Sequence, residues 1–287
     1  MRLVNQQSLA YGGLFVLACG LFLGCAASMK AENALASRVQ AGSALLWDEN
    51  AKRPLFRRQV DAPHPPASTT KLMTALLVYE KTGLAGEVVV SGEDLPSAGE
   101  VSTVRLLPGD RLMVADLVRA LLISSSNEAA LALARHTSGS VGAFVAEMNA
   151  RAKELGCEKT HFVNPSGQTE PGHLSCARDL LRIFEAVLAV EPLRGICASE
   201  SYSLRSAGGK PVQYLMNTNR LLGPYPGMGP AKTGWTREAR HTYAALCQRG
   251  ERKVALILLD SPNKWTDAVA LFDYAFDGNG SGGDSGL

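Results

Sequence analysis

The sequence lacks the spacings that metal sites and redox centres need. Its five histidines form neither HxxxH nor HExxH, and its six cysteines include no CxxC pair. Zinc sites and thioredoxin-like sites depend on such closely spaced ligands. We therefore expect no metal and no other cofactor. The four cysteines beyond the N-terminal segment are expected as buried free thiols, although export would also permit disulfides: Cys157, Cys176, Cys197 and Cys247.

The chain also lacks an excess of charge of one sign. Its 29 basic residues oppose 27 acidic ones, and no long run of either occurs. Such mixing is typical of a solvated surface and gives no basis for a nucleic-acid partner. With 287 residues, of which 46% are apolar, the chain can bury the core of one large domain or two modest ones.

No apolar run is long enough for a comfortable membrane-spanning helix. Residues 1–28 instead have the pattern of a signal peptide or N-terminal anchor: Arg2 precedes the apolar stretch 9–23, and small residues follow. Cleavage after Ala27 or Ala36, lipidation of Cys25 and an uncleaved anchor all remain open. Each alternative places the rest of the chain outside the cytoplasm, in the periplasm or at the outer face of the membrane.

The remaining sequence predicts one domain over residues 37–276, followed by a flexible Gly-rich tail at 277–287. Short alternating segments near both ends predict strands, whereas the middle has helical periodicity. The fold class is therefore α+β: an antiparallel sheet in which an N-terminal hairpin joins C-terminal strands, with a helical lobe beside it. The expected strands are 43–48, 55–59, 202–204, 212–216, 228–234, 242–248 and 253–260. The expected helices are 67–79, 114–123, 128–136, 141–155, 177–190 and 264–276.

The first candidate site lies at the start of the helix expected over 67–79. Ser68 and Lys71 are three residues apart, so they share one face of that helix. A hydroxyl is a poor nucleophile until a base takes its proton, and a lysine held neutral by burial or a nearby cation can do so. Alone, however, the Ser-x-x-Lys pattern is better explained by a capping serine with a solvated lysine.

Two later segments favour the catalytic interpretation. In a turn or extended segment residues i and i+2 point the same way, so Ser125 and Asn127 are expected to face one cleft. At a predicted strand end, Lys232 supplies a cation and Thr233 a hydroxyl for a carboxylate. Gly234, next in the chain, is expected to let a substrate backbone approach closely.

Ser-x-x-Lys, Ser-x-Asn and Lys-Thr-Gly in this order form the signature of penicillin-binding proteins and serine β-lactamases. Further segments resemble the D-alanyl-D-alanine carboxypeptidase family, the low-molecular-mass penicillin-binding proteins of peptidase family S11, over roughly residues 37–276. They are 66–74, 125–130, 161–167, 173–180, 217–221 and 232–236. The resemblance implies a β-lactamase/transpeptidase-like fold, with an antiparallel five-stranded sheet flanked by helices and a helical lobe.

The resemblance also implies the catalytic roles. Ser68 would be the acylated nucleophile, Lys71 its general base, and Ser125 a proton relay to the leaving amine. The backbone amides of Ser68 and Trp235 would form an oxyanion hole, and such holes contribute a few kcal/mol per donor.

The substrate-binding roles follow in the same way. Asn127 would hold the substrate amide, Lys232 would set the local potential, and Thr233 would bind the terminal carboxylate, with Gly234 and Trp235 beside them. The implied substrates are peptidoglycan stem peptides ending in D-Ala-D-Ala, and the implied covalent inhibitors are β-lactams. Independently of the family, a cation at Lys232 disfavours charge on Lys71, which leaves Lys71 able to accept a proton.

The sequence departs from the family pattern in two places. Where members often have Ala-Gly after the Lys-Thr-Gly segment, this chain has Ala239-Arg240, so the family's carboxylate-binding arginine is not assigned. The sequence ends at Leu287 without the second β-domain and amphipathic anchor of many members, as in the D,D-endopeptidase branch. His161, Asn164, His173 and Arg178 lie in matching segments and are expected to hold the helical lobe.

Our main interpretation is therefore a serine-type D-Ala-D-Ala carboxypeptidase that trims peptidoglycan stem peptides, with a D,D-endopeptidase that cuts cross-links as the alternative. A class A β-lactamase needs a further glutamate to activate water, and the sequence has no Glu-x-x-Leu-Asn between Asn127 and Lys232. A peptidoglycan-binding module without catalysis is less favoured because all the motif residues are present.

Overall fold

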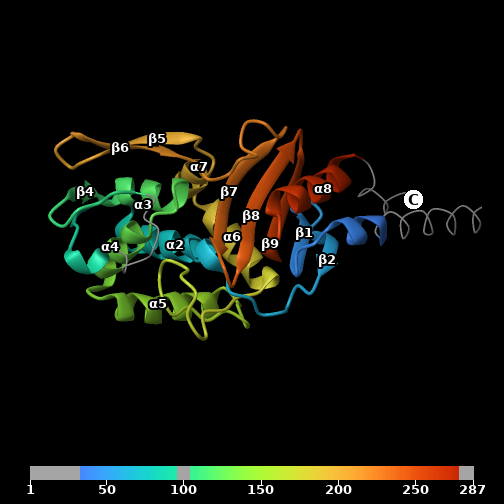
Figure 1. Cartoon of the computed structure of the whole chain (residues 1–287), viewed down its shortest axis with the longest axis horizontal. Helices are drawn as coiled ribbons and strands as arrows, with labels where there is room; N and C mark the ends of the chain where they lie inside the picture. The colour runs from blue at the N-terminus through green and yellow to red at the C-terminus, as the bar shows by residue number, and fades with distance from the viewer. Residues whose placement is uncertain (1–32, 96–103, 278–287) are drawn as a thin grey trace, which may run out of the picture.

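The computed structural model describes residues 33–95 and 104–277. The predicted N-terminal signal or anchor, and nearly all of the predicted tail, lie outside the described residues. A five-stranded antiparallel sheet, in the order β2-β1-β9-β8-β7, stands beside a lobe of helices (Figure 1). Its strands are β1 (Ser43–Asp48), β2 (Arg53–Arg58), β7 (Met228–Thr236), β8 (Arg240–Arg249) and β9 (Arg252–Ser261). The predicted sheet of an N-terminal hairpin and C-terminal strands is confirmed.

Each face of the sheet buries one set of alternating side chains. In β9, Leu256 and Leu258 pack in a cluster with α8 (Lys264–Phe276), which lies across β8 and β9. Ile257 and Leu259, one residue out of step, pack in the larger cluster with α6 (Ala177–Ala189). The near-continuous apolar sequence of β9 is therefore explained by a strand buried on both faces.

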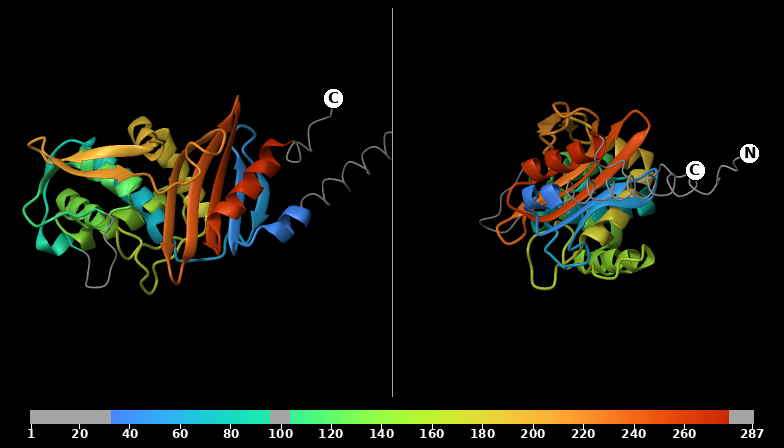
Figure 2. Two further views of the ribbon diagram at one scale, coloured as in Figure 1. Left: turned by 45° about the horizontal axis from the view of Figure 1, so that its top comes forward. Right: turned by 90° about the vertical axis from the view of Figure 1, so that its right-hand side faces the viewer.

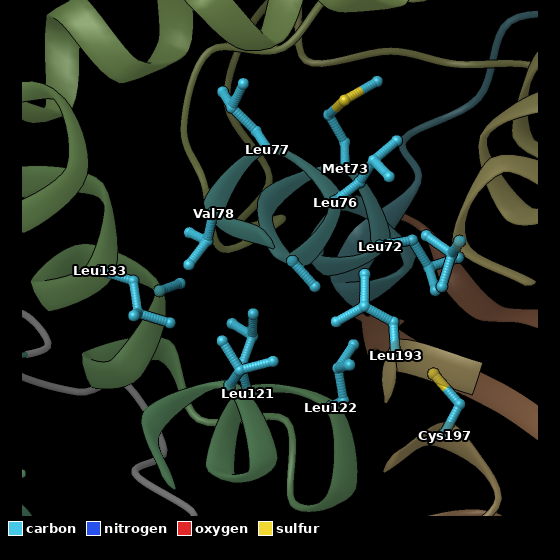
Figure 3. Close-up of a cluster of buried hydrophobic side chains, with 14 of the residues drawn as sticks. Leu72, Met73, Leu76, Leu77, Val78, Leu121, Leu122, Leu133, Leu193 and Cys197 are labelled. Carbon is cyan, nitrogen blue, oxygen red and sulfur yellow. The ribbon is translucent and has the colours of Figure 1, made fainter. Parts of the chain in front are cut away.

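The central helix of the lobe is α2 (Lys71–Thr82), whose residues 71–78 are all buried. A helix that is apolar all round must be surrounded by other elements. Figure 3 shows Leu121 and Leu122 of α3 (Val114–Ile123), Leu133 of α4 (Asn127–Ser138), and Leu193 of α7 (Glu191–Cys197) directed toward α2. The helix ends at Gly83, whose φ of 57° lies in the left-handed region that suits glycine.

The remaining elements complete the lobe and cover its outer side. They are α5 (Val141–Glu154), the 3₁₀ turns η1 (Ala67–Thr70) and η2 (Gly92–Asp94), and the hairpins β3 (Glu87–Val89)–β4 (Arg111–Met113) and β5 (Ser201–Arg205)–β6 (Pro211–Met216). The β5–β6 hairpin lies over α3 at the edge of the lobe (Figures 1 and 2). Its strands were predicted, but they pair only with each other among the described strands.

Two elements were absent from the prediction. The short helix α7 follows the expected helix 177–190 directly, and Pro192 lies in its first turn, where proline has no hydrogen bond to lose. The β3–β4 hairpin joins two three-residue strands 22 residues apart, counted from Val89 to Arg111. Strands this short and this widely separated carry too little periodicity to be recognised from sequence.

The four cysteines of the described chain are buried free thiols, as expected, and burial raises the pKa of each one. Within residues 33–95 and 104–277, no helix combines the length and apolar character needed to cross a membrane. The same residues contain no cluster of histidine, cysteine and carboxylate side chains able to hold a metal ion.

Candidate active site

The site begins where η1 runs directly into α2. Ala67, at the first position of η1, has a φ of 48°, a conformation that costs energy for any residue but glycine. This turn brings Ser68 onto the same helix face as Lys71, and Lys71 Nζ lies 3.0 Å from Ser68 Oγ. The predicted pairing of these two side chains is therefore present in the structure.

Lys71 is fully buried, and its Nζ contacts two further oxygens. It donates to Asn127 Oδ1 at 2.7 Å and to the carbonyl of Ser166. Burial first, and then the charge of Lys232, hold the pKa of Lys71 well below the usual lysine value. A neutral amine has two N–H donors and one lone pair. The two donors match Asn127 and Ser166, which leaves the lone pair for the Ser68 hydroxyl.

The Ser166 carbonyl is held in place by the loop 161–175. Asn164 Oδ1 accepts the backbone N–H of Gly167 at 2.7 Å. The ring of His173 is hydrogen-bonded through Nε2 to Thr70 Oγ1 at 2.8 Å. Its Nδ1 accepts the Val163 N–H at 3.0 Å. Burial lowers the pKa of His173 to about 4, so the ring is neutral near pH 7. Asn164 and His173 are thus positioned to hold the loop, as expected.

Gly167 in the same loop has no room for a side chain. Its φ is 87°, and a Cβ there would lie 1.9 Å from the carbonyl oxygen of Ala67. Glycine is therefore required for the loop to pack directly against the backbone that carries Ser68.

Ser125 lies between α3 and α4 with a φ of 65°, in the left-handed region that serine rarely adopts. Ser126, the next residue, caps α4 by accepting the Ala129 N–H at 3.1 Å. The strained turn directs Ser125 Oγ to Lys232 Nζ, which donates to it at 2.8 Å. Ser125 and Asn127 were expected to face one cleft. In the structure, Ser125 Oγ contacts Lys232 and Asn127 Oδ1 contacts Lys71, so both side chains are directed toward the buried lysines.

Lys232 enters from β7 and is also almost completely buried. Its Nζ donates to Ser125 Oγ and, at 2.8 Å, to the carbonyl of Thr233. Burial is the main cause that lowers the pKa of Lys232, to about 7. Three segments that are far apart in the sequence therefore converge: η1–α2, the α3–α4 turn and β7.

The residues beyond Lys232 continue β7, which is the edge strand of the sheet. Thr233 Oγ1 donates to Thr218 Oγ1 at 2.7 Å, and the Trp235 side chain is 60% exposed. A Cβ at Gly234 would lie 2.7 Å from the Ser68 backbone nitrogen. The close approach that Gly234 allows is therefore with the Ser68 segment itself, whereas the sequence analysis had assigned it to a substrate.

Comparison with known proteins agrees with this geometry. The sequence model of peptidase S11, described as D-alanyl-D-alanine carboxypeptidase, matches residues 28–263. The chain belongs to the D-alanyl-D-alanine carboxypeptidase family. It is 34% identical to the carboxypeptidase DacF of Bacillus subtilis, over 83% of this chain and 62% of DacF, so it spans less than two thirds of that relative. It is 32% identical to the D-alanyl-D-alanine endopeptidase of Escherichia coli, over 88% of this chain and 83% of the relative.

A solved structure of the D-alanyl-D-alanine carboxypeptidase family has the same fold. The crystal structure of the D-alanyl-D-alanine carboxypeptidase from Mycobacterium tuberculosis superposes with a TM-score of 0.76 at 34% identity, covering 83% of this chain and 92% of that one. The β-lactamase/transpeptidase-like fold predicted from sequence is thereby confirmed.

This family member differs where the family pattern has glycine after Ala239. Arg240 adopts a φ of 53°, which a glycine would adopt without strain, and its guanidinium pairs with Asp260 at the surface. Because that ion pair occupies Arg240, this residue is a poor candidate for the unassigned carboxylate-binding cation.

A better candidate was missed by the sequence analysis. Lys264 begins α8, is 7% exposed, and its Nζ lies 2.9 Å from His241 Nδ1. In the described ranges no carboxylate lies within ion-pair distance of it. Burial lowers its pKa to about 8. The sequence did contain one signal for Lys264. A lysine in the first turn of a helix is unfavourable beside the positive end of the helix dipole, so its presence there suggests another role.

Proposed function

We propose that this protein is a serine-type D-Ala-D-Ala carboxypeptidase, which releases the terminal D-alanine of peptidoglycan stem peptides through an acyl-enzyme on Ser68. The single observation that carries the proposal is the 3.0 Å contact between the Ser68 hydroxyl and the buried amine of Lys71. Family membership supports it, since the relatives named above act as D-alanyl-D-alanine carboxypeptidases or endopeptidases.

In the proposed acylation, Lys71 takes the proton of Ser68 while Oγ attacks the carbonyl carbon of the penultimate D-alanine. The oxyanion would be held by the backbone amides of Ser68 and Trp235, which the packing at Gly234 brings close together. Ser125, bonded to Lys232, would pass a proton to the departing amine. Water then releases the acyl group with the same residues acting in reverse.

We assign substrate binding to the residues around the end of β7. Asn127 would bind the substrate amide through the part of its side chain not used by Lys71. Thr233 and Lys264 would bind the terminal carboxylate. The sheet register supports this assignment, because Trp235, two residues beyond Thr233, pairs with His241, which contacts Lys264. A buried cation without a carboxylate partner suits an anionic ligand.

Replacing Lys264 tests the assignment of the carboxylate site. In Lys264→Gln we expect KM for a peptide ending in D-Ala-D-Ala to rise about tenfold with little change in kcat, because one charge-assisted hydrogen bond is lost. Lys264→Arg is the matched control and should keep KM near the wild-type value. Equal KM values for all three proteins would refute the assignment.

The pH dependence of KM follows from the same group. Lysine loses its charge above its pKa, which burial lowers to about 8 for Lys264. We expect KM of the wild type to rise as the pH is raised through this value. In Lys264→Arg the rise should be shallower, since arginine stays charged.

The alternative activity is that of a D,D-endopeptidase cutting peptidoglycan cross-links with the same residues. The Escherichia coli relative named D-alanyl-D-alanine endopeptidase supports it, since this chain covers 83% of that protein's length. Incubation with purified muropeptides, followed by mass spectrometry, separates the two. Loss of one D-alanine from monomeric pentapeptides supports the carboxypeptidase, and conversion of cross-linked dimers to monomers supports the endopeptidase.

The geometry gives little support to a β-lactamase. Within the described residues no carboxylate hydrogen-bonds to Ser68 or Lys71, and Glu170 of the neighbouring loop is exposed and bound to Asn164 at 2.7 Å. Acyl-enzymes formed with penicillin should therefore persist rather than turn over rapidly. A binding module without catalysis would have no need of two buried lysines.

We propose that residues 37–276 form the catalytic domain, that residues 1–28 act as an export signal or N-terminal anchor, and that the Gly-rich residues 277–287 form a flexible tail. The proposed substrate lies outside the cytoplasm. The domain would accordingly work in the periplasm or at the outer face of the membrane, attached to it only through the N-terminal segment or a lipidated Cys25.

A further inference from the structure

One buried carboxylate beside the site has no role in the reaction described above. Glu128 lies in the first turn of α4, directly after Asn127, and only 1% of its surface is exposed. Its Oε2 accepts the Ser126 hydroxyl at 2.8 Å. Its Oε1 is buried and has no hydrogen-bond partner among the described residues.

A role as a helix cap does not account for this side chain. Ser126 already caps α4 through its own hydroxyl, which accepts the Ala129 N–H. A buried carboxylate with one oxygen unpartnered is costly unless a positive charge or dipole compensates it. The helix N-terminus supplies part of the compensation. The remainder would come from a positive charge that forms nearby during the reaction.

The group that becomes a cation in the proposed reaction is Lys71, which lies where α2 packs against α4. Asn127, the neighbour of Glu128, is hydrogen-bonded to its Nζ. Three titratable groups from three segments interact electrostatically with Lys71: Lys232 of β7, Glu128 of α4, and His173 of the loop 161–175. Lys232 lowers the pKa of Lys71, whereas Glu128 raises it, and His173 is neutral near pH 7.

Three carboxylates on elements that pack against α4 are paired with cations of their own. Asp94 pairs with Arg135 at the opposite end of α4, Asp116 with Arg119, and Glu147 with Lys81. For Lys232, burial is the main cause that lowers the pKa, and the next contributions come from Cys197 and Lys264. Glu128 is the carboxylate whose charge raises the pKa of Lys71.

We propose that Glu128 is a positioning residue of the reaction, whose buried carboxylate stabilises the ammonium that Lys71 becomes when it takes the Ser68 proton. The proton moves from Oγ to Nζ as the bond from Oγ to the carbonyl carbon forms, and the carbonyl electron pair moves to its oxygen. This inference rests on the proposed function, in which Lys71 is the base.

The test is the pH profile of Ser68 acylation by a fluorescent penicillin in Glu128→Gln, a change that removes the charge and keeps the shape. Without the carboxylate the pKa of Lys71 falls, so the acid limb of the profile should move down by about one pH unit. The plateau rate should fall about tenfold, because a weaker base accepts the proton less readily. Glu128→Asp, which keeps the charge, should leave the acid limb near its wild-type position.

Ser126→Ala is the matched control for a purely structural role. It removes the cap and the partner of Oε2 but leaves the charge of Glu128, so thermal stability should fall while the acid limb stays in place. An acid limb that does not move in Glu128→Gln, or that moves equally in Ser126→Ala, overturns the inference. Failure of the wild type to be acylated at Ser68 would instead overturn the proposed function.

Discussion

Ser68→Ala should abolish both peptide hydrolysis and covalent penicillin labelling. We expect kcat to fall by roughly 10⁴-fold or more, because the acyl-enzyme cannot form without the hydroxyl and only binding and the oxyanion site remain. The fold should survive, since Ser68 Oγ contacts Lys71 at the site rather than the hydrophobic core and the residue is partly exposed. Steady-state hydrolysis of a D-Ala-D-Ala peptide and the melting temperature check both expectations.

The matched control is Ser203→Ala, which removes an exposed serine of β5. It should retain full activity and labelling. Appreciable hydrolysis by folded Ser68→Ala, or labelling of that variant at the wild-type rate, would assign the nucleophile to another residue.

Lys71→Met should lower the acylation rate by about 10³-fold, within the range that general-base catalysis provides. Methionine fills a similar space, but it cannot accept the Ser68 proton. It also leaves Asn127 Oδ1 and the Ser166 carbonyl without their donor, and each unsatisfied group costs roughly 1–3 kcal/mol. The variant should therefore be less stable as well as slow, and stopped-flow acylation with a circular-dichroism melt measures both effects.

Lys81→Met provides the comparison on the same helix. Lys81 lies in the last turn of α2, is partly exposed and pairs with Glu147 at 2.6 Å. An exposed pair of this kind contributes little to stability, so activity and stability should stay near wild type. If Lys71→Met acylated as fast as Lys81→Met, the base would have to be another group.

Much of the fold was accessible from the sequence because its signals are local. The helix α3 begins and ends as predicted, at Val114 and Ile123, since its apolar periodicity is strong. The motif residues were also found, because Ser68 and Lys71 form one pattern on one helix turn. Nothing in the sequence, however, gave the distance between segments as far apart as Ser125 and Lys232, 107 positions along the chain.

The parts that the sequence did not reveal depend on the three-dimensional packing. The Ser166 carbonyl is a backbone group, so no residue type marks its contact with Lys71. The acidic side chain of Glu128 is ordinary in a first helical turn, and only its burial distinguishes it. Gly234 was predicted to let a substrate backbone approach, and the structure adds that the Ser68 segment packs closely against it.

The most direct test of the account is to locate the acyl group on the wild-type protein. The purified chain would be incubated with a penicillin, digested and analysed by tandem mass spectrometry. The account predicts a single persistent adduct, of the mass of the intact penicillin, on the Ser68 hydroxyl. An adduct on any other residue, or an unmodified protein after prolonged incubation, would contradict it.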